Sequence, residues 1–97
     1  MPAIGRIGDP VTCGDTVAEG SGNVFAGGMP VTRVNSDLTA GHSCYPPTTF
    51  SAGSTTVLCN NLYIVIVGSP IVPHSCPNSS PHGGTLATGM PTVLVES

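Results

Sequence analysis

The chain has 97 residues, of which only 7% are charged, and it contains two arginines, no lysine and a formal net charge of −3. Two cationic side chains cannot neutralise a phosphate backbone, so this composition excludes a nucleic-acid-binding protein. The longest strongly apolar run, residues 62–67, is far shorter than the roughly 20 residues that cross a bilayer, and no apolar leader follows a basic start, so we expect neither a membrane span nor a signal peptide.

Short segments rich in Val, Thr and Ile recur between turn residues along the chain, which is the pattern of an all-β protein. The 13 glycines and 10 prolines are too closely spaced for a helix of useful length. In chain order, the predicted strands cover residues 24–26, 30–34, 55–59, 62–67 and 92–95. The sequence therefore predicts one small all-β domain that spans residues 1–97.

Three similar segments follow one another along the chain. Each has a glycine at a corner (Gly20, Gly53 and Gly89), then turn residues and a valine that begins a predicted strand, and each corner follows a loop that carries His or Cys. A repeat unit of about thirty residues is too small to bury a core of its own, so the units must share one. We therefore expect a pseudo-threefold body in which the His- and Cys-bearing loops meet at one end of the axis.

The histidines and cysteines of these loops predict a metal site. All three histidines lie in equivalent loops, and a core with only 4% aromatic residues gains stability from a bound ion. Zinc fits the donor types, because it accepts four thiolate and imidazole ligands in a tetrahedron. A site closed by four ligands has no open position for substrate, so we predict one structural zinc ion. The predicted ligands are Cys13, His42, His74 and His82.

The sequence leaves the sulfur ligand open. Cys76 lies next but one to His74 and would project to the same face of a strand, so it is the main alternative to Cys13. Cys44 is a third option, whereas Cys59 is expected to be a small buried residue within a strand. Disulfides are the competing interpretation of the four cysteines, and the lack of a signal peptide disfavours them.

The order and spacing of these motifs resemble those of PAAR-repeat proteins, a family named for a Pro-Ala-Ala-Arg motif. The similar stretches are residues 6–14, 20–25, 37–47, 53–57 and 74–83. Residues 30–33, Pro-Val-Thr-Arg, stand where the naming motif would be. The segment 60–70 departs from the family pattern, because it lacks the Arg and the Asp that the pattern has there.

The resemblance implies a fold and a role. It implies a small cone of three pseudo-threefold-related β-hairpin units, with a zinc ion near the vertex held by three His and one Cys. Such a cone caps and sharpens the trimeric VgrG spike of the bacterial type VI secretion system, as a monomer on a trimer, for puncture of a target membrane and delivery of effectors. We expect residues 1–97 to form this cone without a fused effector.

The resemblance also sets expectations for location and partners. The protein would be made in the bacterial cytoplasm and delivered outside the cell with the spike, with transient contact to the target membrane and possible attachment of effector proteins. The run 62–67 shows no clean alternation of apolar and polar residues, so it is a candidate base strand, with Leu62, Ile64 and Ile66 as candidate contacts to the spike.

Three other functions compete with this interpretation. The chain could form the tip of a contractile phage tail spike, or an unrelated zinc-stabilised β binding module. A Cys–His pair could also act as nucleophile and base, which would make the chain an enzyme. A domain this small has little room for a substrate pocket, so we expect no enzyme.

Overall fold

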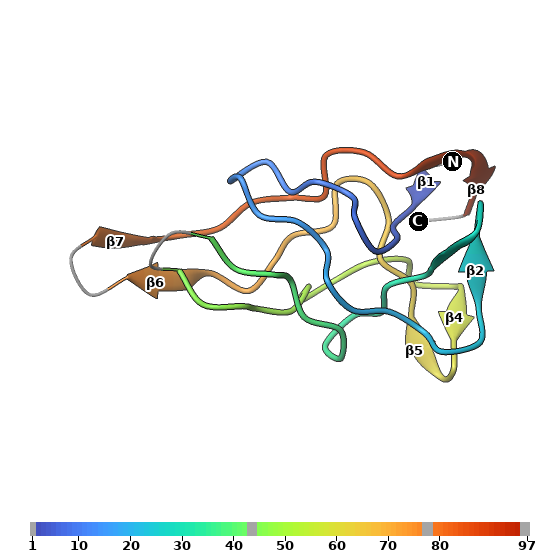
Figure 1. The fold of residues 1–97 in the computed structure, drawn as a ribbon. Coiled ribbons are helices and arrows are strands. Elements are labelled where there is room, and N and C mark those ends of the chain that lie inside the picture. The colour runs from blue at the N-terminus through green and yellow to red at the C-terminus, as the bar shows by residue number, and fades with distance from the viewer. Residues whose placement is uncertain (1, 43–44, 77–78, 96–97) are drawn as a thin grey trace.

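A computed structural model describes residues 2–42, 45–76 and 79–95, and these ranges contain short strands, bridges and turns but no helix. Accordingly, nothing in the described ranges could cross a membrane as an apolar helix. The strands pair antiparallel as four two-stranded sheets, β1–β8, β2–β3, β4–β5 and β6–β7 (Figure 1). Their bounds are β1 Ala3–Ile4, β2 Phe25–Ala26, β3 Met29–Pro30, β4 Leu58–Cys59, β5 Leu62–Tyr63, β6 His74–Cys76, β7 Ser79–His82 and β8 Met90–Leu94.

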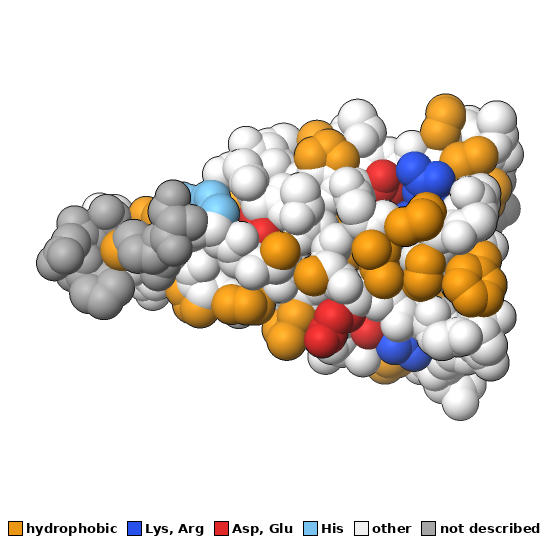
Figure 2. Space-filling model, viewed as in Figure 1, with side chains coloured by type: hydrophobic (Ala, Val, Ile, Leu, Met, Phe, Trp, Pro, Cys, Tyr) orange, Lys and Arg blue, Asp and Glu red, His pale blue; other side chains and the backbone are white. Residues whose placement is uncertain are grey.

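The molecule tapers along its long axis, with extents of 39 × 23 × 22 Å. Strands β6 and β7 form the narrow end, and β1, β2, β4, β5 and β8 gather at the wide end (Figure 1). The space-filling view narrows in the same direction (Figure 2). The predicted all-β cone is therefore confirmed.

Three backbone segments meet around the axis of this cone. The Gly5 N–H donates to the Val65 carbonyl (2.8 Å), the Val65 N–H to the Thr32 carbonyl (3.2 Å), and the Thr32 N–H to the Gly5 carbonyl (3.1 Å). All three residues are buried. Because each segment donates to one neighbour and accepts from the other, the three bonds form a closed ring. This ring is the pattern of a threefold axis, and it confirms the pseudo-threefold arrangement.

The strands are shorter than the sequence predicts, because each segment passes from one partner to the next. Residues 62–67 pair with β4 only over Leu62–Tyr63, after which Ile64 bridges to Arg33 and Ile66 bridges to Ile4. The prediction of continuous strands over 30–34, 55–59 and 62–67 is therefore wrong in extent. Residues 24–26 and 92–95 overlap β2 and β8.

Three antiparallel strand pairs surround the wide end, and two of them are hairpins. Strands β2 and β3 are joined by a turn at Gly27 and Gly28, and β4 and β5 by a turn at Asn60 and Asn61; all four residues have positive φ. Such φ values are typical of two-residue hairpin turns. The third pair joins β8 with β1, two strands that are far apart in the sequence and are not connected by a turn. This corrects the expectation that each repeat ends in a hairpin of its own.

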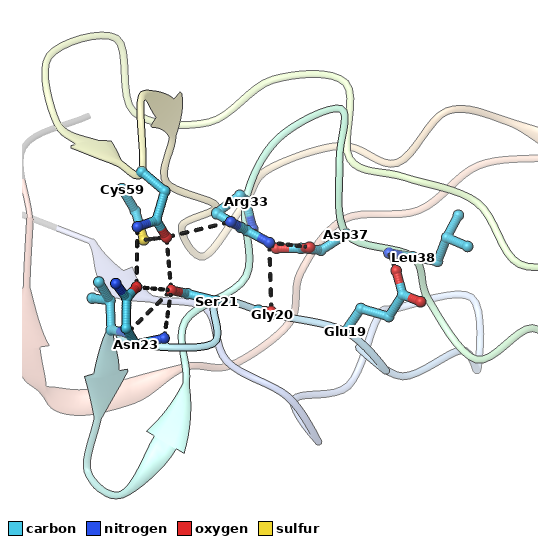
Figure 3. A network of polar contacts seen from close by, with 10 residues as sticks. Glu19, Gly20, Ser21, Asn23, Arg33, Asp37, Leu38 and Cys59 are labelled. Atoms are coloured by element: carbon cyan, nitrogen blue, oxygen red, sulfur yellow. Dashed lines mark hydrogen bonds and ion pairs between the residues drawn. The ribbon is translucent and has the colours of Figure 1, made fainter.

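Polar side chains connect these two hairpins (Figure 3). The Ser21 hydroxyl lies 2.7 Å from Asn60 Oδ1, and Asn60 Nδ2 donates to Asn23 Oδ1 at 3.0 Å. Arg33 reaches the same Asn60 oxygen through Nη1 at 3.3 Å and pairs with Asp37 through Nε at 2.7 Å. The turn of the second hairpin is thus tied to the corner that precedes the first.

The third unit lacks an arginine–aspartate pair and replaces it by a serine. In the first unit Asp9 accepts the backbone N–H of Arg6, and in the second Asp37 accepts that of Arg33. At the equivalent place in the third unit, the Ile66 N–H donates to a serine hydroxyl, Ser69 Oγ, at 2.9 Å. The turn is therefore kept although the departure at residues 60–70 removes both charges.

Apolar side chains fill the cone in two clusters. The first is made of Val11, Val17, Val34, Phe50, Val65, Ile71 and Leu86, and the second of Ile4, Ala26, Val31, Cys59, Ile64 and Ile66. Cys59 is buried and its thiol is free, as the sequence predicts. No residue of either cluster belongs to β6 or β7, so these two strands do not contribute to the apolar core.

Candidate metal centre

Three imidazoles and one thiol converge beside the narrow end of the cone. Cys13, His42, His74 and His82 each offer one donor atom, and these four atoms all lie within 4.8 Å of one another. The Nε2 atom of His42 is 3.4 Å from that of His74 and 3.0 Å from that of His82, and the last two are 2.7 Å apart. The structure thus brings together the four residues named from the sequence, and this group could hold a metal ion.

Two of the histidines are positioned by the hairpin of β6 and β7. His74 pairs with His82 across the two strands, so their side chains stand on one face. The sequence predicts loops here, and the structure corrects this to a β-hairpin. Within β6, His74 and Cys76 are both buried and Ser75 is exposed, which is the same-face arrangement expected for a strand.

The other two donors come from turns in the first and second repeats. His42 and Tyr45 exchange two backbone hydrogen bonds, of 3.1 and 2.7 Å, which fix the turn that carries the His42 imidazole. Gly14 follows Cys13, and a Cβ at this glycine would lie only 3.3 Å from His42 Nδ1. The absence of a side chain at position 14 therefore lets the imidazole approach the cysteine.

The backbone sets the proton position on one imidazole. His74 Nδ1 lies 2.8 Å from the carbonyl oxygen of Pro46. Because a carbonyl only accepts, Nδ1 must carry the proton, and Nε2 then presents a lone pair toward His42 and His82. A histidine that binds a metal through one nitrogen commonly donates from the other in this way.

The donor geometry fits a small tetrahedral ion. Two nitrogen ligands of a tetrahedral zinc ion lie about 3.3 Å apart, given zinc–nitrogen bonds of about 2.0–2.1 Å. The His42–His74 distance of 3.4 Å matches that value, and the other two Nε2–Nε2 distances, 3.0 and 2.7 Å, are shorter. Three imidazoles and one thiolate also supply four ligands, which is the number that closes a tetrahedral zinc site.

Electrostatics favour the neutral form of His82. Partial burial lowers the pKa of this imidazole, the neighbouring His74 and His42 lower it further, and Asp15 raises it. The pKa lies below its usual value, so the ring is neutral near pH 7. Neutral imidazole is the form that binds metal ions.

Tyr45 covers the three imidazoles, and it was missed in the sequence. Its ring centroid lies 3.8 Å from that of His82 with the planes 20° apart, and 5.2 and 5.0 Å from those of His42 and His74. Its hydroxyl donates to the Ser80 carbonyl at 3.1 Å. The only indication of this contact in the sequence is that Tyr45 lies three residues after the predicted ligand His42.

The cysteines separate into two kinds. Cys13 and Cys59 are free thiols, whereas Cys76 is disulfide-bonded. A disulfide sulfur is not a thiolate, so Cys76 is not available as the alternative ligand. The expectation that disulfides are disfavoured is therefore wrong at Cys76. Cys44, the third option, lies outside the described residues.

Two of the three predicted contact residues at the base are buried. Ile64 and Ile66 are only 5% and 6% exposed, and Leu62 is half-buried, so the two isoleucines are core residues. Figure 2 shows hydrophobic side chains gathered toward the wide end. The large exposed apolar residues on the strands of that end are Phe25, Met29, Leu58, Tyr63 and Leu94.

Comparison with known families gives one match. A family model described as PAAR motif matches residues 7–77, which is most of the chain. The matched range includes Cys13, His42 and His74, and His82 lies just beyond it. No curated protein sequence matches the chain.

Proposed function

The chain belongs to the PAAR motif family, whose members serve as spike tips, and we propose that it caps and sharpens the trimeric VgrG spike of a type VI secretion system. The observation that carries the proposal is the cone itself, with metal donors beside its narrow end and exposed apolar side chains at its wide end. A narrow, stiff end suits membrane puncture, and an apolar end suits a partner.

The wide end is the proposed docking face. Each of its three strand pairs presents a large apolar residue to solvent: Phe25, Leu58 and Leu94 are 57%, 54% and 50% exposed. Several large exposed apolar side chains at one end of a small protein are typical of an interaction site. A pseudo-threefold monomer can place near-equivalent strand pairs over the three chains of a trimer, which supports one cone per spike.

The proposed ion at the donor cluster is zinc. When bound, zinc supplies a cross-link between segments that are distant in sequence. His74 and His82 would bind the ion from the β6–β7 hairpin, and Cys13 and His42 would bind it from the first two repeats. The ion would thereby join the hairpin to these repeats. The four donors face one point and leave no position for substrate, which supports a structural rather than an enzymatic role.

The docking proposal is tested by mixing the chain with a purified trimeric VgrG protein and measuring the mass of the complex by size-exclusion chromatography with light scattering. We expect one chain per trimer. Leu58→Asp should abolish the complex, because it places a charge on the apolar face. Val72→Asp is the matched control, since Val72 is 40% exposed but lies outside the strands of the wide end.

Two outcomes would contradict the proposal. The first is failure of the unmodified chain to co-elute with any VgrG trimer encoded in the same genome. The second is equal loss of binding in both variants. If the chain bound a contractile phage spike instead of VgrG, the same docking face would serve that spike.

A further inference from the structure

Asp15 is a buried carboxylate with an oxygen that lacks a partner. The residue is 1% exposed, and its Oδ1 accepts the backbone N–H groups of Thr16 (2.8 Å) and Gly41 (2.9 Å). Its Oδ2 is equally buried, and among the described residues it has no hydrogen-bond partner. A buried anionic oxygen in this state is costly unless a positive charge lies nearby.

The cationic side chains of the protein do not supply that charge. The chain has two arginines and no lysine. Arg6 is paired with Asp9, and Arg33 with Asp37. The compensation for Asp15 must therefore come from another source.

Asp15 connects the two turns that carry Cys13 and His42. It lies next but one to Cys13, and Gly41, whose N–H it accepts, directly precedes His42. Its own carbonyl accepts the Val11 N–H at 2.8 Å, which closes the turn around Cys13. One side chain thus fixes two of the four donors relative to each other.

We propose, on the basis of the zinc site proposed above, that Asp15 is the positioning residue of the metal centre and the counter-charge of its ion. One thiolate and three neutral imidazoles leave one unit of positive charge on a bound divalent ion. The Asp15 carboxylate balances that unit. The orphaned oxygen and the bound ion then stabilise each other across the turn that Asp15 holds.

The first test measures zinc affinity of the full chain by competition with a chelator. Asp15→Asn removes the charge and keeps an oxygen for the two N–H groups, and we expect zinc affinity to fall about 10–100-fold, as for other residues that support metal ligands. Asp37→Asn is the matched control, because Asp37 is also buried but is paired with Arg33. It should lower the melting temperature and leave zinc affinity unchanged.

Binding of a second ion distinguishes the two roles proposed for Asp15, which are to balance the charge of the ion and to position its ligands. Cu⁺ accepts the same donors but carries one charge, so, with oxygen excluded, Asp15→Asn should weaken Cu⁺ binding less than Zn²⁺ binding. Equal weakening of both ions, or an unchanged zinc affinity, would overturn the proposed counter-charge.

A second uncharged variant guards against misfolding of the first. Asp15→Ser also removes the charge and keeps one side-chain oxygen beside the N–H groups of Thr16 and Gly41. It should show the same difference between the two ions as Asp15→Asn. An unmodified chain that binds no zinc would overturn the zinc site itself, and this result is visible before any variant is compared.

Discussion

Thr32 and Val65 occupy equivalent positions in the ring of backbone hydrogen bonds around the axis, and both are 0% exposed. They differ in one respect, because the Thr32 hydroxyl is buried without a hydrogen-bond partner in the described part of the chain. Valine is accommodated at the equivalent position, so the site around Thr32 is suited to a methyl group in place of the hydroxyl.

Thr32→Val should therefore stabilise the protein. Removing an unsatisfied buried hydroxyl is expected to raise the free energy of unfolding by about 1–2 kcal/mol. The measurement is chemical denaturation of the metal-loaded chain. Thr39→Val is the matched control: Thr39 is also buried, but its hydroxyl accepts the Thr48 N–H at 3.1 Å, so this change should destabilise. A loss of stability in both variants would contradict the prediction.

Removal of one imidazole should empty the metal site. His82→Ala is expected to lower zinc content from about one ion per chain to near zero and to lower the free energy of unfolding by more than about 2 kcal/mol, because metal binding is coupled to folding. Elemental analysis and thermal melting measure the two effects. Ser80→Ala, an exposed change in the same strand, should alter neither. Full zinc content in His82→Ala would exclude His82 as a ligand.

The two cysteines near the site should respond differently to the same substitution. Cys13→Ser should lose zinc during desalting, because serine does not supply a thiolate. Cys76→Ser should keep about one zinc per chain and lose stability through loss of its disulfide. Zinc content after desalting distinguishes them, and retention of zinc by Cys13→Ser alone would assign the sulfur ligand elsewhere.

The Tyr45 ring should slow loss of the ion. Tyr45→Ala is expected to speed zinc transfer to a chelator by about 2–10-fold, which corresponds to the loss of aromatic stacking. Tyr45→Phe keeps the ring over His82 and lacks only the hydrogen bond to Ser80, so its rate should stay close to that of the unmodified chain. If both variants released zinc equally fast, the hydroxyl rather than the ring would shield the site.

The repeats and the four donors could be predicted because they are local regularities of the sequence. The glycine corners recur along the chain, and each histidine falls in an equivalent segment. A shared axis follows from the size of the units, and the structure shows it in the ring of Gly5, Thr32 and Val65.

Other features depend on contacts between distant residues, which local patterns do not encode. The extents of the strands were wrong because Ile64 and Ile66 bridge to different segments. The contacts of Asp15 with Gly41 and of Tyr45 with His82 were missed because each joins residues that are far apart in the sequence. The disulfide of Cys76 depends on which cysteine the fold brings within bonding distance, and the local sequence does not encode that distance.

The pairing of β1 with β8 has a consequence for the order of folding. The segments of the first two hairpins are complete once residue 63 has been synthesised, but β1 must wait for residues 90–94 before it has a partner. Closing so long a loop costs chain entropy and slows folding. On the ribosome, we therefore expect the base to stay open, with one unpaired edge, until residues 90–94 have emerged from the exit tunnel.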